Sequence, residues 1–187
     1  MSRSATKVID VIKTAAAYLE LPDEVFGGVV SEGMRNADLD KLIRCFNSVV
    51  SEIAEEYAPF VKEENVVTLS GIIPYALFSE RICKLEYLKQ NGVKVRFKCL
   101  PGHVKPETEG TFEARYRYLP PALDIDGEIN MPLNISDRIV ALGVAAEYAL
   151  IVERYEESVK FGEKYMEAMK HAVRCGREII MPKRSFR

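Results

Sequence analysis

Clustered carboxylates are the residues of this sequence that come closest to a metal-binding pattern. One cluster contains Glu52, Glu55 and Glu56, a second contains Glu63 and Glu64, and a third contains Glu153, Glu156 and Glu157. A helical bundle that holds two metal ions combines such carboxylates with Glu-x-x-His motifs, and neither histidine of this chain supplies one. We therefore interpret the clusters as solvated acidic surface and predict no metal site.

Two further segments contain residue types suited to ligand binding. The run from Asp124 to Glu128, DIDGE, has the oxygen density of a calcium loop but lacks the regular ligand spacing, so we interpret it as a turn. The segment EARYRYL places Tyr116 and Tyr118 on the face opposite to its arginines, as a base-stacking platform would. Because the whole chain is slightly acidic, we favour core tyrosines beneath exposed arginines.

The motifs of nucleotide-binding loops, nucleophile elbows, zinc proteases and EF-hands do not occur in the sequence. We accordingly predict no catalytic residue and no cofactor. The four cysteines include no C-x-x-C pair, which argues against zinc and thioredoxin-like sites, and we expect reduced, mostly buried thiols at Cys45, Cys83, Cys99 and Cys175. His103 follows Pro101 and Gly102, and we interpret it as a surface residue of a loop.

Composition excludes several classes of partner. The 187 residues have a formal net charge of -2, which leaves no basic footprint for nucleic acid as the main ligand. No apolar run approaches the roughly 18 residues of a membrane span, and the N-terminal segment lacks the apolar core of a signal peptide. We expect the protein to remain in the compartment that makes it, without membrane contact.

Apolar spacing of three and four residues predicts two helices in the N-terminal third. The first is expected from Ala5 to Leu19, with Ser4 as a candidate cap. The Gly-rich stretch from Pro22 to Asn36 is expected to form a loop. The second helix should begin near Asn36 or Asp38 and end before Pro59, because proline removes an amide donor.

The period changes to two between Val61 and Leu119, which predicts a small antiparallel sheet with one apolar and one charged face. Asn91-Gly92 has the preferred sequence of a type I′ hairpin turn. The apolar sets expected to alternate with charged residues are Cys83, Leu85 and Tyr87; Val93, Val95 and Phe97; and Phe112, Ala114, Tyr116 and Tyr118.

Helical spacing returns after Asn134 or Ser136, either of which can cap a helix. We expect a break near Arg154 or Tyr155 and a fourth helix that ends near Gly176. Gly143 inside the third helix indicates close helix packing. The predicted fold class is α+β, with a helical bundle of about four helices formed by residues 1–60 and 134–176, a β insertion at 61–133, and a tail at 177–187.

The helical segments resemble those of a known family. The sequences RCFNSVVSEIAEEYAPFVKEENV and SDRIVALGVAAEYALIVERYEESVKFGEKYMEAMKHA, with RYRYLPP between them, are similar to head-to-tail adaptor (connector) proteins of tailed phages, of the tail tubular protein A type. The most specific part is the pairing of an N-x-V-x-x-E-I-A-x-x-Y helix, Asn47 to Tyr57, with an A-A-E-Y helix, Ala145 to Tyr148.

This resemblance implies a virion structural protein that forms a ring, commonly of twelve copies, between the portal and the tail tube or nozzle. It also implies that genomic DNA passes through the ring without sequence-specific binding, and that the C-terminal tail grips the portal. The tail residues assigned to portal binding are Ile179, Ile180, Met181, Lys183, Arg184, Phe186 and Arg187. The alternative is a monomeric intracellular interaction module whose helices form a groove for a partner peptide.

Overall fold

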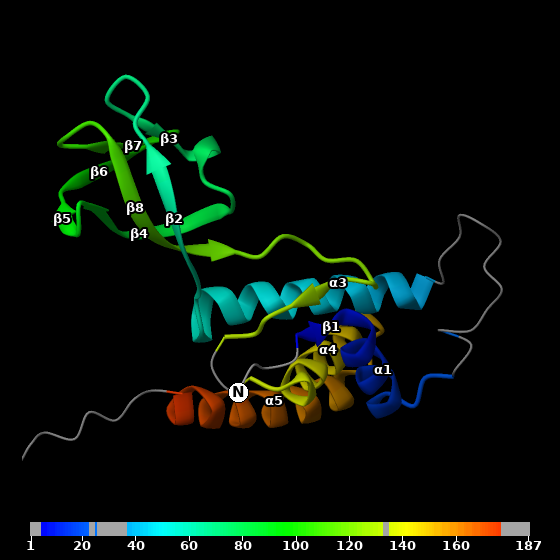
Figure 1. Ribbon diagram of the computed structural model, residues 1–187. Coiled ribbons are helices and arrows are strands. Elements are labelled where there is room, and N and C mark those ends of the chain that lie inside the picture. Colours follow the sequence, from blue (N-terminus) through cyan, green and yellow to red (C-terminus); the bar gives the residue numbers. More distant parts are fainter. Residues whose placement is uncertain (1–4, 23–24, 26–36, 133–134, 177–187) are drawn as a thin grey trace, which may run out of the picture. The chain divides into compact units, whose positions relative to one another are not determined.

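A computed structural model describes residues 5–22, 25, 37–132 and 135–176 (Figure 1). The chain divides into two compact units: a helical unit of residues 1–49 and 123–187, and a sheet unit of residues 50–122. The predicted α+β class is confirmed, because the described residues form four α-helices and several small antiparallel sheets. Within these residues, no helix is both long and apolar enough to cross a membrane.

Helix α1 spans Val8–Tyr18 and buries one face at a spacing of three and four residues, with Val8, Val11, Ile12, Ala15 and Ala16 all inaccessible. It begins three residues later than predicted. The reason is that Thr6–Lys7 forms a short strand, β1, which pairs antiparallel with β9, Glu128–Ile129. Thr6 Oγ1 also donates a hydrogen bond of 2.6 Å to Asp137 Oδ1.

Helix α3 spans Ala37–Glu52 and continues as one π-helical turn, Ile53–Tyr57. The predicted start and the predicted end before Pro59 are both confirmed. Its buried positions repeat at helical spacing and include Leu42, Phe46 and Val49. The apolar periodicity of the sequence therefore identified the face that this helix buries.

Helices α4, Asp137–Ile151, and α5, Tyr155–Gly176, follow one another along the chain. Ser136 occupies the N-cap position of α4, and the predicted break is present, with Glu153 in a left-handed conformation at φ 62°. Helix α4 packs against both α1 and α5 (Figure 1). The prediction that helices from the two ends of the sequence pack together is confirmed.

Gly143 lies where α4 packs most closely on its neighbours. A Cβ atom at this position would lie 2.9 Å from Val49 Cγ1 of α3 and 3.1 Å from Tyr165 Cε2 of α5. Both distances are shorter than ordinary van der Waals contact, so a side chain would force the helices apart. The close packing predicted at Gly143 is confirmed.

The sheet unit contains two antiparallel sheets. The four-stranded sheet has the order β2 (Phe60–Val67), β8 (Thr111–Leu119), β4 (Arg81–Gln90) and β5 (Val93–Val95), and the three-stranded sheet has the order β3 (Ile73–Pro74), β7 (His103–Pro106) and β6 (Phe97–Leu100). A short 3₁₀ helix, Tyr75–Leu77, follows β3. Both sheets contribute to one core, whose inaccessible members include Ile73, Leu88, Val104, Phe112 and Tyr116.

The predicted Asn91-Gly92 hairpin is confirmed: φ is 52° at Asn91 and 80° at Gly92, and Gln90 pairs with Val93. The alternation from Val93 to Phe97 was expected to form one strand, but the chain changes sheets at Arg96. The Arg96 carbonyl accepts a hydrogen bond from the Glu107 amide, and β6 then pairs with β7. This change also places His103 at the start of a strand instead of in a loop.

Several predictions fall outside the described residues. They are the Ser4 and Asn134 caps, nearly all of the Pro22–Asn36 loop, and the whole tail of residues 177–187.

Candidate functional site

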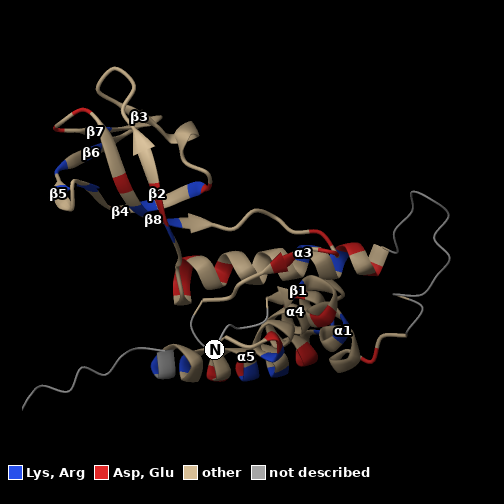
Figure 2. Ribbon diagram, in the orientation of Figure 1, with Lys and Arg blue, Asp and Glu red and all other residues tan. Residues whose placement is uncertain are grey.

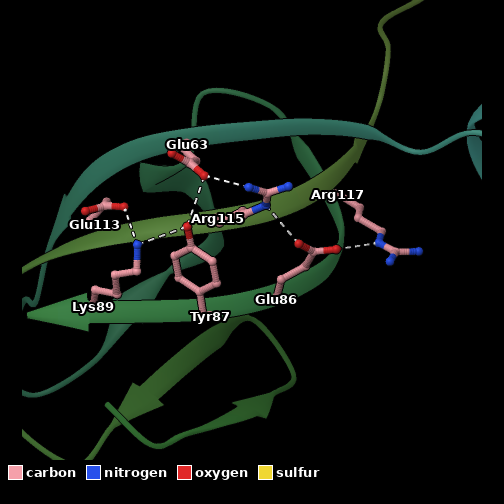
Figure 3. Close-up of polar contacts among 7 residues, drawn as sticks. All are labelled: Glu63, Glu86, Tyr87, Lys89, Glu113, Arg115 and Arg117. Atoms are coloured by element: carbon pink, nitrogen blue, oxygen red, sulfur yellow. Dashed lines mark hydrogen bonds and ion pairs between the residues drawn. The ribbon is translucent and has the colours of Figure 1, made fainter. Parts of the chain in front are cut away.

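Charged and tyrosine side chains form a connected network on the outward face of the four-stranded sheet (Figure 3). On β8, alternate residues point to this face, and Arg115 and Arg117 both donate hydrogen bonds to Glu86 of β4, at 3.0 and 2.8 Å. Arg115 also contacts Glu63 of β2 at 2.9 Å. The network thus joins three neighbouring strands, and its members are Glu63, Glu86, Tyr87, Lys89, Glu113, Arg115 and Arg117.

Tyr87 and Glu86 reach this face together because β4 is irregular. Register shifts between Ile82 and Lys84 and between Leu85 and Tyr87 mark β-bulges, each of which inserts a residue and changes the face of those that follow. Leu85 and Leu88 are therefore the buried residues of the strand. The expectation that Cys83, Leu85 and Tyr87 share an apolar face is wrong for this reason.

The network is electrically balanced, with three carboxylates and three cationic side chains. Hydrogen bonds from Arg117 lower the pKa of Glu86 most strongly, and Arg115 lowers it further against the opposing effect of desolvation. The hydrogen bond to Glu113 raises the pKa of Lys89. Because opposite charges pair throughout the network, it supports the pairing of β2, β8 and β4.

A second polar cluster lies on the opposite face of the same sheet. Tyr116 is fully buried, and its hydroxyl donates a hydrogen bond of 2.8 Å to Glu64 Oε1, while Ser79 Oγ donates to Glu64 Oε2. Burial raises the pKa of Tyr116 to about 12, so it remains a neutral donor. For Tyr116 the interpretation as a core tyrosine is confirmed, and a buried ring cannot stack on a nucleic-acid base.

The other chemically suggestive segments behave as local structure. The DIDGE segment forms a turn, as predicted, in which the Gly127 amide donates to the Asp124 carbonyl at 2.8 Å and Gly127 O accepts from the Val8 amide. Within residues 5–22, 25, 37–132 and 135–176, no three His, Cys, Asp or Glu side chains are grouped as metal ligands. The described acidic clusters therefore provide no assembled metal site.

The cysteines differ from expectation. Cys45 is buried, whereas Cys83 and Cys99 are free and exposed, so the prediction of mostly buried thiols is wrong for these two. Cys83 lies at the first bulge of β4, and Cys99 lies on the edge strand β6. Both line one pocket of about 710 Å³ together with Tyr75, a site that sequence spacing could not indicate because the two cysteines belong to different sheets.

The two helices that carry the family resemblance contact each other within the helical unit. Val49 of α3 packs at Gly143 of α4, and the carboxylate of Asp38 accepts a hydrogen bond from Tyr148, which with desolvation raises the pKa of Tyr148 to about 12. The seven tail residues assigned to portal binding lie outside the described residues. Comparison with models of protein families and with curated protein sequences gave no match.

Proposed function

We propose that the chain is a virion structural subunit, a head-to-tail adaptor that assembles as a ring between the portal and the tail of a phage. In this proposal the subunit catalyses no reaction. Its partners are other copies of itself, twelve in the ring by analogy with the family, the portal, and the tail tube or nozzle. Genomic DNA passes through the ring without sequence-specific contacts.

The observation that carries the proposal is the large amount of exposed apolar side chain in both units. In the helical unit, Tyr155 and Val159 are each 61% exposed, and in the sheet unit Val93 is 69% and Leu69 is 53% exposed. Large apolar side chains that gather at a surface mark sites of protein association. A ring subunit that contacts its neighbours through both units would bury these apolar side chains on assembly.

The packing of the resembling helices is a second support. The Asn47–Tyr57 and Ala145–Tyr148 motifs resemble the adaptor family through their packing residues, and Val49 and Tyr148, one from each motif, make contacts between α3 and α4. Asn47, the first residue of its motif, holds the main chain at the start of the 123–187 segment. The motifs are therefore consistent with a scaffold that other proteins recognise.

Assembly and portal binding test the proposal directly. The purified full chain is expected to form rings visible by electron microscopy, alone or on added portal rings, and a chain truncated after Gly176 should lose portal binding. If sedimentation velocity shows a compact monomer that does not bind portal rings, the adaptor function is contradicted. That result would favour the monomeric interaction module. Undiminished portal binding by the truncated chain would contradict the role assigned to the tail.

A further inference from the structure

The strands from β4 to β7 carry a local excess of positive charge (Figure 2). Between Arg81 and Lys105 the sequence contains seven lysines or arginines and one carboxylate, Glu86, although the whole chain has a formal net charge of -2. Glu86 already accepts hydrogen bonds from Arg115 and Arg117 of β8. The seven cations of this segment are Arg81, Lys84, Lys89, Lys94, Arg96, Lys98 and Lys105.

Four of these cations form a strip along the β5–β6 segment and the neighbouring strand β7. Lys94, Arg96 and Lys98 alternate along the segment, and Lys105 lies directly opposite Lys98. All four are exposed, and none of them forms an ion pair with any residue that the structure describes. We call these four residues the basic strip. The last three line one open pocket of about 970 Å³, in which Glu107 is the one carboxylate.

Cations also face one another across neighbouring strands in this part of the sheet unit. Besides the pair within the basic strip, Lys89 lies opposite Lys94 and Lys84 lies opposite Arg117. Like charges directly across two strands repel each other. The carboxylate of Glu113 compensates Lys89 at 3.1 Å. The strip itself has no such ion pair, so an anion from outside the chain would stabilise it.

The apolar side chains within the strip are turned towards the protein. Val95 and Phe97, which alternate with the cations, pack against the core of the sheet unit. The exposed apolar residues of the segment, Val93 and Leu100, lie at its two ends. Protein interfaces have an apolar centre, whereas the phosphates of nucleic acids are bound by cations and hydrogen-bond donors. The composition of the strip therefore favours a polyanion over a protein surface.

The spacing of the cations fits an extended line of negative charge. Alternate residues of an extended chain lie about 6.8 Å apart, so Lys94, Arg96 and Lys98 extend over about 14 Å. Each strand of DNA carries one negative charge per about 3.4 Å of helix axis. A phosphate backbone can therefore contact all three cations, whereas a single small anion would neutralise only part of the strip.

We propose that the basic strip binds the phosphate backbone of double-stranded DNA without reading its bases. This inference rests on the proposed function, in which genomic DNA passes through the ring, and it names the surface that contacts that DNA. Each cation that neutralises a phosphate releases counterions, so the affinity falls steeply as the salt concentration rises. Contacts of this kind also let a protein and DNA slide along each other.

The salt dependence of DNA binding tests the strip. The strip variant carries Lys94→Gln, Arg96→Gln and Lys98→Gln, and fluorescence anisotropy of a labelled duplex measures binding between about 50 and 200 mM salt. For the wild type, we expect the logarithm of the binding constant to decrease linearly with the logarithm of the salt concentration. The slope of the strip variant should be smaller in magnitude by about 2–3, because each phosphate contact contributes nearly one. At the lowest salt concentration the variant should bind about tenfold or more weakly.

A matched control separates the strip from net charge. Lys160→Gln, Lys164→Gln and Lys170→Gln remove the same charge from exposed positions of α5 and should leave the salt slope nearly unchanged. Circular dichroism confirms that both variants fold. A duplex of unrelated sequence should bind the wild type equally well, since the proposed contacts involve only the backbone.

Several outcomes would overturn the inference. They are no DNA binding by the wild type at the lowest salt concentration, equal losses in the strip and control variants, and tighter binding of a Glu-rich peptide or an RNA duplex than of the DNA duplex. A wild-type chain that forms rings or binds portal rings but not DNA would overturn this inference and leave the adaptor function intact. A chain that binds DNA through the strip but neither assembles nor binds portal rings would contradict the adaptor function and support the strip.

Discussion

The side-chain amide of Asn47 in α3 forms two hydrogen bonds with the main chain of Leu123, one as acceptor and one as donor. Asn47 Oδ1 accepts a hydrogen bond of 2.8 Å from Leu123 N, and Nδ2 donates one of 2.9 Å to Leu123 O. The same Nδ2 donates to Ile43 O at 3.0 Å, within α3. One side chain therefore ties the helix to the point where the chain re-enters the helical unit after the sheet unit.

Asn47→Ala is expected to lower the free energy of unfolding by about 1–3 kcal/mol, because the Leu123 amide and carbonyl lose their partners in a partly buried place. Urea denaturation followed by circular dichroism measures the change. The control is Ser48→Ala, the exposed next residue of the same helix, which should alter stability by less than about 0.5 kcal/mol. Equal effects of the two substitutions would contradict the role given to Asn47.

Gly143 in α4 and Gly162 in α5 should respond to alanine with opposite signs. Gly162→Ala in α5 places the new Cβ in open space, so the higher helix propensity of alanine should stabilise the protein by about 0.5–1 kcal/mol. Gly143→Ala gains the same propensity but forces the Cβ against Val49 and Tyr165, at a cost of about 1–3 kcal/mol. Thermal unfolding of both variants tests the pair, and stabilisation by Gly143→Ala would show that α4 is not closely packed there.

Features that depend on residues adjacent in the sequence could be predicted correctly. The Asn91-Gly92 turn, the end of the second helix before Pro59 and the break before Tyr155 all follow from backbone preferences of a few residues. Gly143 could be identified because glycine weakens a helix, so its place inside an apolar helical pattern indicates a neighbour that leaves no room for a side chain.

The missed features depend on residues far apart in the sequence. The bulges in β4 arise from pairing with β8, so alternation alone assigned Tyr87 to the wrong face. The hydrogen bonds between Asn47 and Leu123 join residues 76 positions apart. The motif that contains Asn47 was identified from the sequence, but the partner of its side chain could not be predicted. The pairing of β6 with β7, which places Lys98 opposite Lys105, could not be predicted either, because the expected single sheet did not bring these segments together.

Thiol labelling should separate the cysteines into two classes. In a Cys175→Ser variant, Cys83 and Cys99 are expected to react with an aromatic disulfide reagent under native conditions because both are exposed. Cys45 should react only after unfolding, since desolvation in the helical unit raises its pKa to about 12, with a further contribution from Glu147. Mass spectrometry of the labelled peptides assigns the sites, and labelling of Cys45 as fast as Cys99 would contradict the packing of α3.

Carboxylates on the two faces of the four-stranded sheet should make the stability of the chain depend on pH. Hydrogen bonds from Arg117 and Arg115 hold the pKa of Glu86 below its ordinary value of 4.5, and those from Ser79 and Tyr116 outweigh desolvation and lower the pKa of Glu64. A carboxyl group whose pKa is lower in the folded chain contributes stability that is present above the unfolded pKa. That contribution is lost as the pH falls through the folded value, when the carboxylate becomes protonated.

We therefore expect the free energy of unfolding to decrease as the pH is lowered below about 4.5. Glu86→Gln should remove about 1 kcal/mol or less at neutral pH and make the decrease at acidic pH shallower, because one of the groups responsible is absent. Glu107→Gln removes an exposed carboxylate that has no ion pair among the described residues, and it should leave the acid slope unchanged. Urea titrations at several pH values between about 3 and 7 provide the comparison. An unchanged slope in Glu86→Gln would show that Arg115 and Arg117 do not hold this carboxylate in its charged form.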